Sequence, residues 1–286
     1  MKPGIFRVVF AVCLNSSFLG FYAHSGFMQG LAEAGRRPAA LSGASAGALV
    51  AGFLAAGKTA DETAAILLQP DLRATLLDWG TPWRALGTLA NRPGFTGAVN
   101  TDRAARLLRE HLGERRIEDC TQPRLALSVT NLTAGRSEIV TSGPLAEFIL
   151  ASGAFPGVFA ARRIDGAQFW DGGIANPLPF EPWLADPAID TILVHIVVNP
   201  TELAVRDPGR RLNVAGAFSL SHQIICDELL RWKTEAARLA GKRLIFLRTE
   251  APRPGLMSSR RVAPACIAAG LATARADRAL ISTLGA

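Results

Sequence analysis

The chain has 286 residues, of which 49% are apolar and 19% are charged. This composition excludes an intrinsically disordered or fibrous protein and is typical of a globular chain with a large core. The 31 basic and 24 acidic residues leave a net charge of +7. The basic residues are scattered rather than gathered in the stripe that nucleic-acid binding requires, so no nucleic-acid partner is expected.

The apolar segments and the cysteines indicate where the protein is located and whether it binds a metal. The apolar run at residues 8–14 lacks a convincing cleavage site behind it, so it is expected to be a buried first strand in a cytoplasmic protein. The longest run without charged or polar side chains, residues 46–57, is too short to span a bilayer. The four cysteines have no zinc-type spacing, so reduced thiols, no metal and no cofactor are expected.

Hydrophobic periodicity predicts strands that alternate with helices along most of the chain. This alternation favours one α/β domain over residues 1–286, with a mostly parallel sheet covered by helices on both faces. The predicted strands are 6–14, 39–43, 124–130, 191–198 and 242–248, and the predicted helices are 21–35, 46–57, 103–112, 144–152, 215–239 and 264–283.

The segment 71–99 differs from the rest, because Trp79 and Trp83 stand among leucines, glycines and prolines. Thr81 and the proline after it predict the start of a short helix, with both tryptophans on one apolar surface. Arg84 and Arg92 would be available there for phosphate. Two interpretations stay open: the aromatic side chains complete the core, or they form a lid or membrane-contact surface.

Gly43, Ser45 and Gly47 form a Gly-x-Ser-x-Gly motif between a short predicted strand and an alanine-rich helix. This is the setting of a nucleophile elbow, in which a tight turn exposes the serine at a helix N-terminus. A plain Gly/Ala-rich turn is the alternative. An acyl-transfer serine also requires a base and an oxyanion hole.

Asp171 is the best candidate for the base. Trp170 precedes it and Gly172 and Gly173 follow it, so a turn presents a carboxylate beside an aromatic ring that can exclude water. Partial burial raises the basicity of such a carboxylate. A conventional triad with His195 or His222 is the alternative, although His195 falls within an apolar strand.

Four blocks of sequence together resemble the patatin-like phospholipases: residues 43–49, 129–136, 151–159 and 171–177. The resemblance is strongest over residues 6–200. It implies a three-layer α/β/α fold and a Ser45–Asp171 dyad without a histidine. It also implies a lipid or phospholipid substrate, with peripheral membrane contact.

The segment 15–20 departs from that family's glycine-rich oxyanion loop, because it has serines and lacks the usual basic residue. The resemblance places the oxyanion hole at the backbone amides of Ser16, Ser17 and Phe18. The histidine in the helix that follows, His24, is expected to pack rather than to react. Asn176, five residues after Asp171, is expected to shape the turn.

The sequence therefore predicts a serine acyl hydrolase that cleaves lipid acyl esters through an acyl-enzyme. Two alternatives stay open because of the altered loop: a weakly active or non-catalytic lipid-binding protein, and a carboxylesterase for short acyl chains.

Overall fold

The computed structural model describes residues 9–69, 78–198, 214–252, 254 and 259–284. Parts of two predictions, residues 6–8 of the first strand and 71–77 of the aromatic segment, lie outside them. The strands are β1 (Phe10–Leu14), β2 (Ala40–Gly43), β3 (Gly97–Val99), β4 (Arg124–Asn131), β5 (Arg136–Val140), β6 (Gly157–Phe159), β7 (Arg162–Ile164), β8 (Ala167–Asp171), β9 (Thr191–Val198) and β10 (Arg243–Glu250). The helices are α1 (Phe21–Glu33), α2 (Ala46–Ala55), α3 (Ala60–Leu68), α5 (Thr81–Leu89), α6 (Asp102–Leu112), α7 (Leu145–Ser152), α8 (Glu181–Leu184), α10 (Val214–Leu239), α11 (Ser259–Ala276) and α12 (Arg278–Ser282).

The main sheet has the strand order β10-β9-β1-β2-β4-β8-β7, with β5 paired to β4 outside this path. The pairs from β10 to β4 are parallel, whereas β5, β7 and β8 pair in antiparallel fashion. The predicted α/β class with a mostly parallel sheet is therefore confirmed. The sequence analysis did not predict the antiparallel strands.

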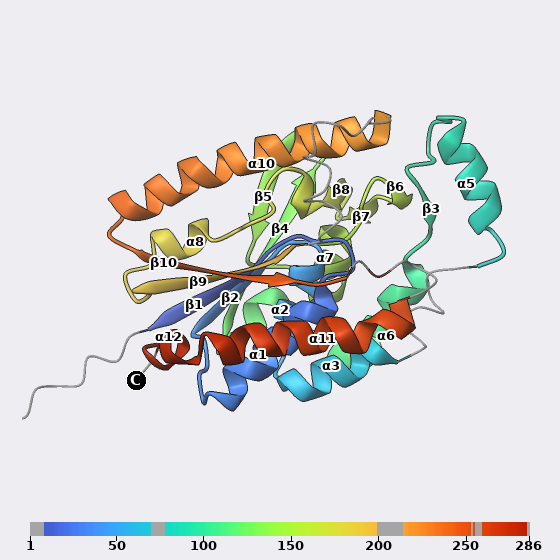
Figure 1. The fold of residues 1–286 in the computed structure, drawn as a ribbon. Helices are drawn as coiled ribbons and strands as arrows, with labels where there is room; N and C mark the ends of the chain where they lie inside the picture. The colour runs from blue at the N-terminus through green and yellow to red at the C-terminus, as the bar shows by residue number, and fades with distance from the viewer. Residues whose placement is uncertain (1–8, 70–77, 199–213, 253, 255–258, 285–286) are drawn as a thin grey trace, which may run out of the picture.

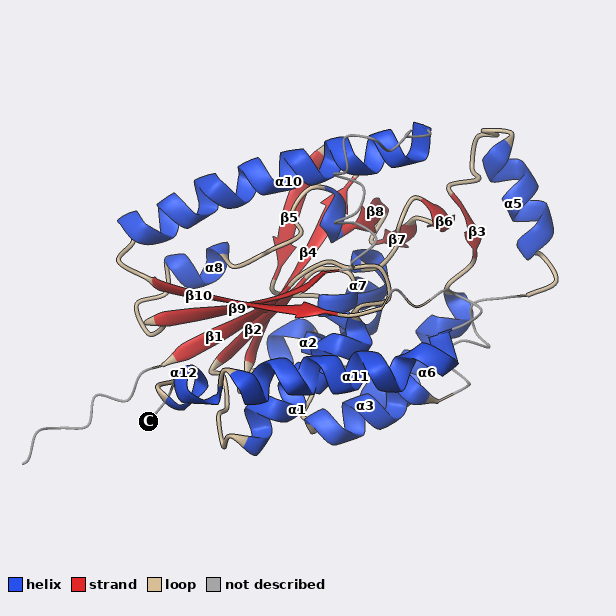
Figure 2. Cartoon of the chain, in the orientation of Figure 1, coloured by secondary structure: helices blue, strands red, loops and turns tan. Residues whose placement is uncertain are grey.

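Helices cover both faces of the sheet, in three layers (Figures 1 and 2). The long helix α10 and the short α8 lie on one face, and α1, α2, α3 and α11 lie on the other. Strand β1 shows why both faces need cover, because Val12 and Leu14 pack in one core cluster while Ala11 and Cys13 pack in the other. A strand buried on both faces has the continuous apolar run of a parallel sheet.

Helices α1 and α11 pack unusually closely because glycines line their contact. A Cβ atom on Gly26 would lie 2.0 Å from the carbonyl oxygen of Ile267, and one on Gly270 would lie 1.9 Å from that of Ala23. The single helix predicted over 264–283 is instead two helices, α11 and α12, which meet at Asp277.

Helix α5 projects from the end of the molecule, apart from the two helical layers (Figure 1). Its only buried residue is Gly87, while Trp79 just before it is 97% exposed and Trp83 within it is 73% exposed. The predicted helix is present, but Gly80 is its N-cap rather than Thr81. The expectation that Arg84 is available for phosphate was wrong, because its guanidinium is paired with Asp78.

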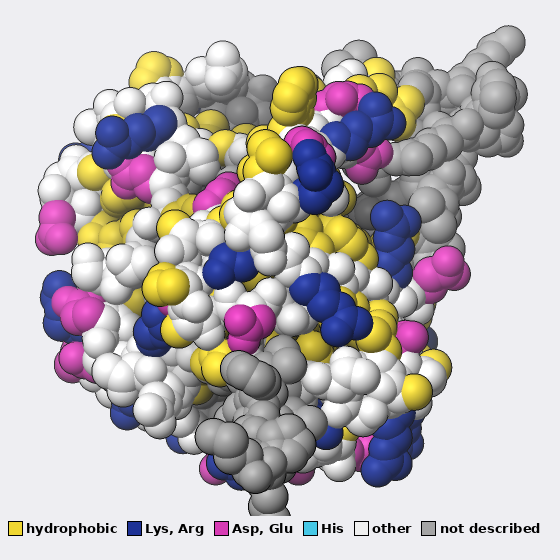
Figure 3. Space-filling model, turned by 90° about the vertical axis from the view of Figure 1, so that its left-hand side faces the viewer, with side chains coloured by type: hydrophobic (Ala, Val, Ile, Leu, Met, Phe, Trp, Pro, Cys, Tyr) yellow, Lys and Arg dark blue, Asp and Glu magenta, His cyan; other side chains and the backbone are white. Residues whose placement is uncertain are grey.

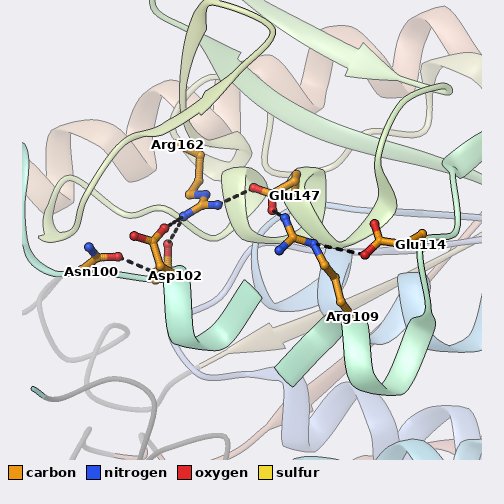
Figure 4. Close-up of polar contacts among 7 residues, drawn as sticks. Asn100, Asp102, Arg109, Glu114, Glu147 and Arg162 are labelled. Atoms are coloured by element: carbon orange, nitrogen blue, oxygen red, sulfur yellow. Dashed lines mark hydrogen bonds and ion pairs between the residues drawn. The ribbon is translucent and has the colours of Figure 1, made fainter. Parts of the chain in front are cut away.

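The two-stranded sheet of β3 and β6 joins this projecting segment to the body, next to a cluster of charged side chains (Figure 4). Glu147 of α7 accepts hydrogen bonds from Arg109 of α6 and from Arg162 of β7. Arg162 also donates to Asp102 over 2.7 Å. The cluster therefore ties α6, α7 and β7 together around the largely buried pair of Glu147 and Arg162.

The surface shown in Figure 3 has basic, acidic and apolar side chains interspersed. Among the described residues, no helix has the combination of length and hydropathy needed to cross a bilayer.

Candidate active site

The strand register brings the candidate residues together at one end of the central strands, which we call the catalytic edge in the proposals below. Leu14 of β1 is aligned with Gly43 of β2, and Gly43 with Leu127 of β4. Asp171, at the end of β8, is aligned with Val129, two residues farther along β4. The loop after β1, the serine motif after β2 and the Asp-Gly-Gly turn after β8 therefore meet.

Ser45 occupies a strained position between β2 and α2. Its φ is 52° and its ψ is −115°, and it is the N-cap of α2. Such a backbone conformation in a residue other than glycine occurs mainly where neighbouring structure enforces it, often at functional sites. The two motif glycines allow this turn to pack, because a Cβ atom on Gly43 would lie 2.4 Å from the backbone of Gly47, and one on Gly47 would lie 2.2 Å from the carbonyl oxygen of Leu14.

A second serine, Ser152 at the end of α7, holds the turn in place. The Ser45 N–H donates to Ser152 Oγ over 2.9 Å, and Ser152 Oγ donates to the carbonyl oxygen of Ser128 over 2.7 Å. Ser152 lies in one of the four blocks of family resemblance, but no role was expected for it. Its only local signal was a polar residue at the end of an apolar helix.

Asp171 and Ser45 are in direct contact. Ser45 Oγ donates to Asp171 Oδ2 over 2.7 Å, and the Gly173 N–H donates to Asp171 Oδ1 over 2.6 Å. Gly172 lies directly against β4, since a Cβ atom there would lie 2.0 Å from the carbonyl oxygen of Ser128. The Asp-Gly-Gly turn thus fixes both oxygens of the carboxyl group, with one of them on the serine hydroxyl.

Burial makes Asp171 an unusually basic carboxylate. The side chain is almost completely buried, and desolvation raises its pKa to about 7, against the opposing effect of the hydrogen bonds from Ser45 and Gly173. A carboxylate with such a pKa accepts a proton more readily than an exposed one does.

Neither candidate triad histidine has a hydrogen bond to Ser45 or Asp171 among the contacts of the described residues. His195 is fully buried in β9 and contacts His24 and Thr249. His222 of α10 lies 2.8 Å from the carbonyl oxygen of Ile174, just beyond the Asp-Gly-Gly turn. The geometry therefore favours a serine–carboxylate pair over a triad.

The loop 15–20 begins with a strongly anchored residue, Asn15. Its N–H donates to the carbonyl oxygen of His195 over 3.2 Å, and its side-chain oxygen accepts from the Val197 N–H over 2.9 Å. The next amide, that of Ser16, donates to the carbonyl oxygen of Pro177 over 2.9 Å. Of the three amides expected to bind an oxyanion, the one of Ser16 is thus already engaged within the protein.

The rest of this loop lies against the Asp-Gly-Gly turn. A Cβ atom on Gly173 would lie 2.0 Å from Ser16 Oγ. Ser17 Oγ is buried without a hydrogen-bond partner among the described residues, and Leu19 has a φ of 54°. The loop that follows β1 is therefore compact and partly strained.

A buried lysine that was not predicted as a site residue, Lys233, supports the segment that follows the Asp-Gly-Gly turn. Lys233 of α10 donates to Asn176 Oδ1 over 2.8 Å and to the carbonyl oxygen of Leu178, and its Nζ lies 2.9 Å from Glu181 Oε1. Asn176 also donates to Glu181 over 2.9 Å, so its expected role in shaping the turn agrees with its position. Lys233 holds the segment whose Pro177 carbonyl accepts from Ser16.

Comparisons with known proteins agree with this architecture. Two curated NTE family proteins, from Mycobacterium tuberculosis and Mycobacterium bovis, are each 36% identical over 189 residues, which is 65% of this chain and 48% of theirs. The chain thus spans about half the length of these relatives. The structure of VipD from Legionella pneumophila has a similar fold, with a TM-score of 0.52 and 15% identity over 96% of this chain and 67% of VipD.

A family model described as patatin-like phospholipase matches residues 12–184, which include the serine motif, the Asp-Gly-Gly turn and the strands that align them. Because the match covers more than half of the chain, the chain belongs to the patatin-like phospholipase family.

Proposed function

We propose that the protein is a serine acyl hydrolase in which Ser45 is the nucleophile and Asp171 the general base. The observation that carries the proposal is the hydrogen bond of 2.7 Å from Ser45 Oγ to Asp171 Oδ2. Family membership supports the same reaction class. The strained Ser45 backbone, fixed by Ser152, adds the pre-organisation that a nucleophile requires.

In the proposed reaction, Asp171 takes the Ser45 proton while Ser45 Oγ attacks the ester carbonyl carbon. The tetrahedral intermediate collapses to an acyl-enzyme, and the leaving alkoxide receives the proton from Asp171. Water then gives a proton to Asp171 and attacks the acyl group, which releases the fatty acid and returns the proton to Ser45. The pKa of Asp171, about 7, suits both directions of this proton transfer.

We assign the stabilisation of the oxyanion to the loop 15–20 and to the N-terminus of α2. Backbone N–H groups can bind an oxyanion whatever side chain they carry, so serines can replace the glycines usual in this family. Because the Ser16 amide donates to Pro177, we leave it out of the oxyanion hole and keep the other two amides that the family resemblance implies, those of Ser17 and Phe18. The dipole of α2, which begins directly after Ser45, adds a favourable partial positive charge.

We further propose that the substrate is a lipid ester, delivered at a membrane surface by the segment 71–99. Trp79, Trp83 and the similarly exposed Leu86 and Leu89 present large apolar side chains to solvent. Tryptophan suits the boundary between water and acyl chains, because its ring is apolar and its N–H is polar.

Another exposed aromatic side chain lies near the proposed catalytic residues. Phe155 is also exposed, and the preceding residue, Ala154, accepts a hydrogen bond from the Asp171 N–H over 3.0 Å. Strand β6, which begins two residues after Phe155, pairs with β3 of the projecting segment. This arrangement supports a path for an acyl chain from the membrane surface to Ser45.

The test is hydrolysis of p-nitrophenyl esters of increasing chain length and of phospholipid vesicles, by the wild type and by Ser45→Ala. A lipid hydrolase cleaves the long-chain and vesicle substrates, and Ser45→Ala does not. Cleavage restricted to short soluble esters would identify a carboxylesterase. Vesicle binding by folded protein without any hydrolysis would identify a lipid-binding protein.

A further inference from the structure

Two buried histidines that the proposed reaction does not use are in direct contact. His24 of α1 and His195 of β9 are both completely buried, and their Nδ1 atoms lie 2.8 Å apart. The ring of Phe27 stacks on His195 with a centroid distance of 3.8 Å. Within the described part of the chain, neither imidazole has a charged hydrogen-bond partner.

The two imidazoles belong to a chain of polar contacts that ends at the loop 15–20. His24 Nε2 lies 3.0 Å from the carbonyl oxygen of Asn15, and His195 Nε2 lies 2.8 Å from Thr249 Oγ1. Thr249 Oγ1 lies 2.8 Å from Thr273 Oγ1, which lies 3.1 Å from the carbonyl oxygen of Ala269 in α11. These contacts thus connect the loop after β1 with α1, β9, β10 and α11.

The number of available protons limits the ways in which this series of contacts can be ordered. A neutral imidazole supplies one N–H and each threonine one O–H, so four protons serve the five contacts. Both imidazoles are neutral, because burial lowers the pKa of His24 to about 4 and holds that of His195 well below its ordinary value. One of the five contacts must therefore lack a proton.

Two of the five contacts end at carbonyl oxygens that only accept, those of Asn15 and Ala269. When the contact at Asn15 keeps its proton, His24 is protonated on Nε2. Its bare Nδ1 then accepts from Nδ1–H of His195, whose bare Nε2 accepts from Thr249. Either hydroxyl can donate in the contact between Thr249 Oγ1 and Thr273 Oγ1, because each can both donate and accept, and in this order Thr273 is the donor. The contact left without a proton is the one from Thr273 to Ala269, the least costly to lose because helical carbonyls already accept backbone N–H groups.

His24 contacts both ends of the candidate oxyanion loop, one through its side chain and the other through its backbone. The His24 side chain donates to the carbonyl oxygen of Asn15, and the His24 N–H donates to that of Gly20 over 3.0 Å. His24 therefore closes the loop 15–20 into a ring. Any movement of its imidazole shifts the start of the loop relative to Ser45.

We infer that His24 is a positioning residue for the acyl-transfer site: its Nε2–H, oriented by His195 and Thr249, holds the loop amides where the oxyanion forms. The inference rests on the proposed function. It assigns no proton transfer to either histidine.

Two substitutions of His24 separate this role from simple packing. The side-chain amide of His24→Gln can reach the place of Nε2 and donate to Asn15, whereas that of His24→Asn reaches only the place of Nδ1. We expect His24→Asn to lower kcat by about tenfold or more with KM changed by less than about twofold, because oxyanion contacts form mainly in the transition state. His24→Gln should recover most of that loss.

His111→Asn is the matched control, because His111 is a half-buried histidine of α6 whose ring contacts Phe53. Thermal unfolding shows whether the two His24 variants are equally folded. Equal kcat in His24→Asn, His24→Gln and the wild type would overturn the inference, as would equal losses in both variants at equal stability. Activity that survives in Ser45→Ala would instead overturn the proposed function.

NMR of nitrogen-labelled histidine in the wild type tests the proton order without any activity or variant stability. We expect one ring protonated only on Nε2, that of His24, and one protonated only on Nδ1, that of His195. Protonation of His195 on Nε2, or of either buried ring on both nitrogens, would overturn the proposed order.

Discussion

The proposed catalytic edge, where the loops after β1, β2 and β8 meet, and helix α5 are built in opposite ways. At the edge, Asp171 is buried and each of its carboxyl oxygens has a donor, and the Ser45 N–H is fixed by Ser152. Helix α5 buries only Gly87. Five large apolar side chains of the described residues 78–99 are exposed: Trp79, Trp83, Leu86, Leu89 and Phe95. The edge fixes individual atoms, as chemistry requires, whereas the exposed surface adds nothing to the core and is typical of a contact surface.

The largest expected effect comes from breaking the catalytic pair. Ser45→Ala and Asp171→Asn should each reduce kcat by on the order of a thousandfold or more, and the double variant should be no worse, because the two residues act as one unit. Turnover of a soluble ester by folded protein measures this. Additive losses in the double variant would contradict a shared role.

The charged cluster between the two regions should affect stability strongly. Glu147→Ala leaves the guanidinium groups of Arg109 and Arg162 without their shared partner. We expect a loss of about 2 kcal/mol in the free energy of unfolding, because the largely buried Arg162 keeps only Asp102 of its two carboxylate partners. Denaturant unfolding measures it.

Glu228→Ala is the matched control for that change, because its pair with Arg231 is exposed on α10. Exposed pairs contribute less than about 1 kcal/mol. Equal effects of the two substitutions would show that the cluster does not hold the base of the projecting segment.

The aromatic surface should affect only aggregated substrates. The double variant Trp79→Ala/Trp83→Ala should lower hydrolysis of phospholipid vesicles by about tenfold, because two exposed aromatic anchors are lost. Hydrolysis of a soluble short-chain ester and the melting temperature should not change, since both side chains are exposed.

Trp232→Ala on α10 is the control for this variant, as Trp232 is also an exposed tryptophan. Equal losses on both substrate forms with a lower melting temperature would assign Trp79 and Trp83 to the core. An equal effect of Trp232→Ala on vesicles would mean that the contact surface is not specific to the segment 71–99.

Sequence periodicity predicted the elements with long apolar runs, and β9 has the predicted bounds. It missed the antiparallel strands β5, β7 and β8, whose pairing depends on short turns more than on buried runs. The motif around Ser45 and the turn at Asp171 were local signals. The roles of Ser152 and Lys233 were not, because their partners lie far away in the sequence.

Arg84, in helix α5, is another residue whose partners could not be predicted from the sequence. Its positive charge was visible in the sequence, but its pairing with Asp78 and its hydrogen bond to the carbonyl oxygen of Ala98 depend on the fold. The exposure of Trp79 and Trp83 likewise required the structure, because an aromatic residue beside a helix is compatible with core and surface alike.

The smallest expected effect is in the loop 15–20. Ser17→Gly removes a buried hydroxyl without a partner among the described residues and relaxes the backbone, so kcat should rise, by less than about threefold. Ser16→Gly removes a side chain that packs against Gly173 and should lower kcat slightly. A fall in Ser17→Gly as large as that in Ser16→Gly would assign a role to the Ser17 hydroxyl.

The central claim, that Asp171 activates Ser45, is tested most directly by the rate at which a fluorophosphonate labels the protein as a function of pH, with the labelled residue mapped by mass spectrometry. The account predicts labelling at Ser45, at a rate that falls as the pH drops through about 7, because protonated Asp171 cannot accept the serine proton. Asp171→Asn should label very slowly at every pH, and His222→Ala should keep the acid limb. Rapid labelling of Ser45 in Asp171→Asn, or loss of the acid limb in His222→Ala, would contradict the account.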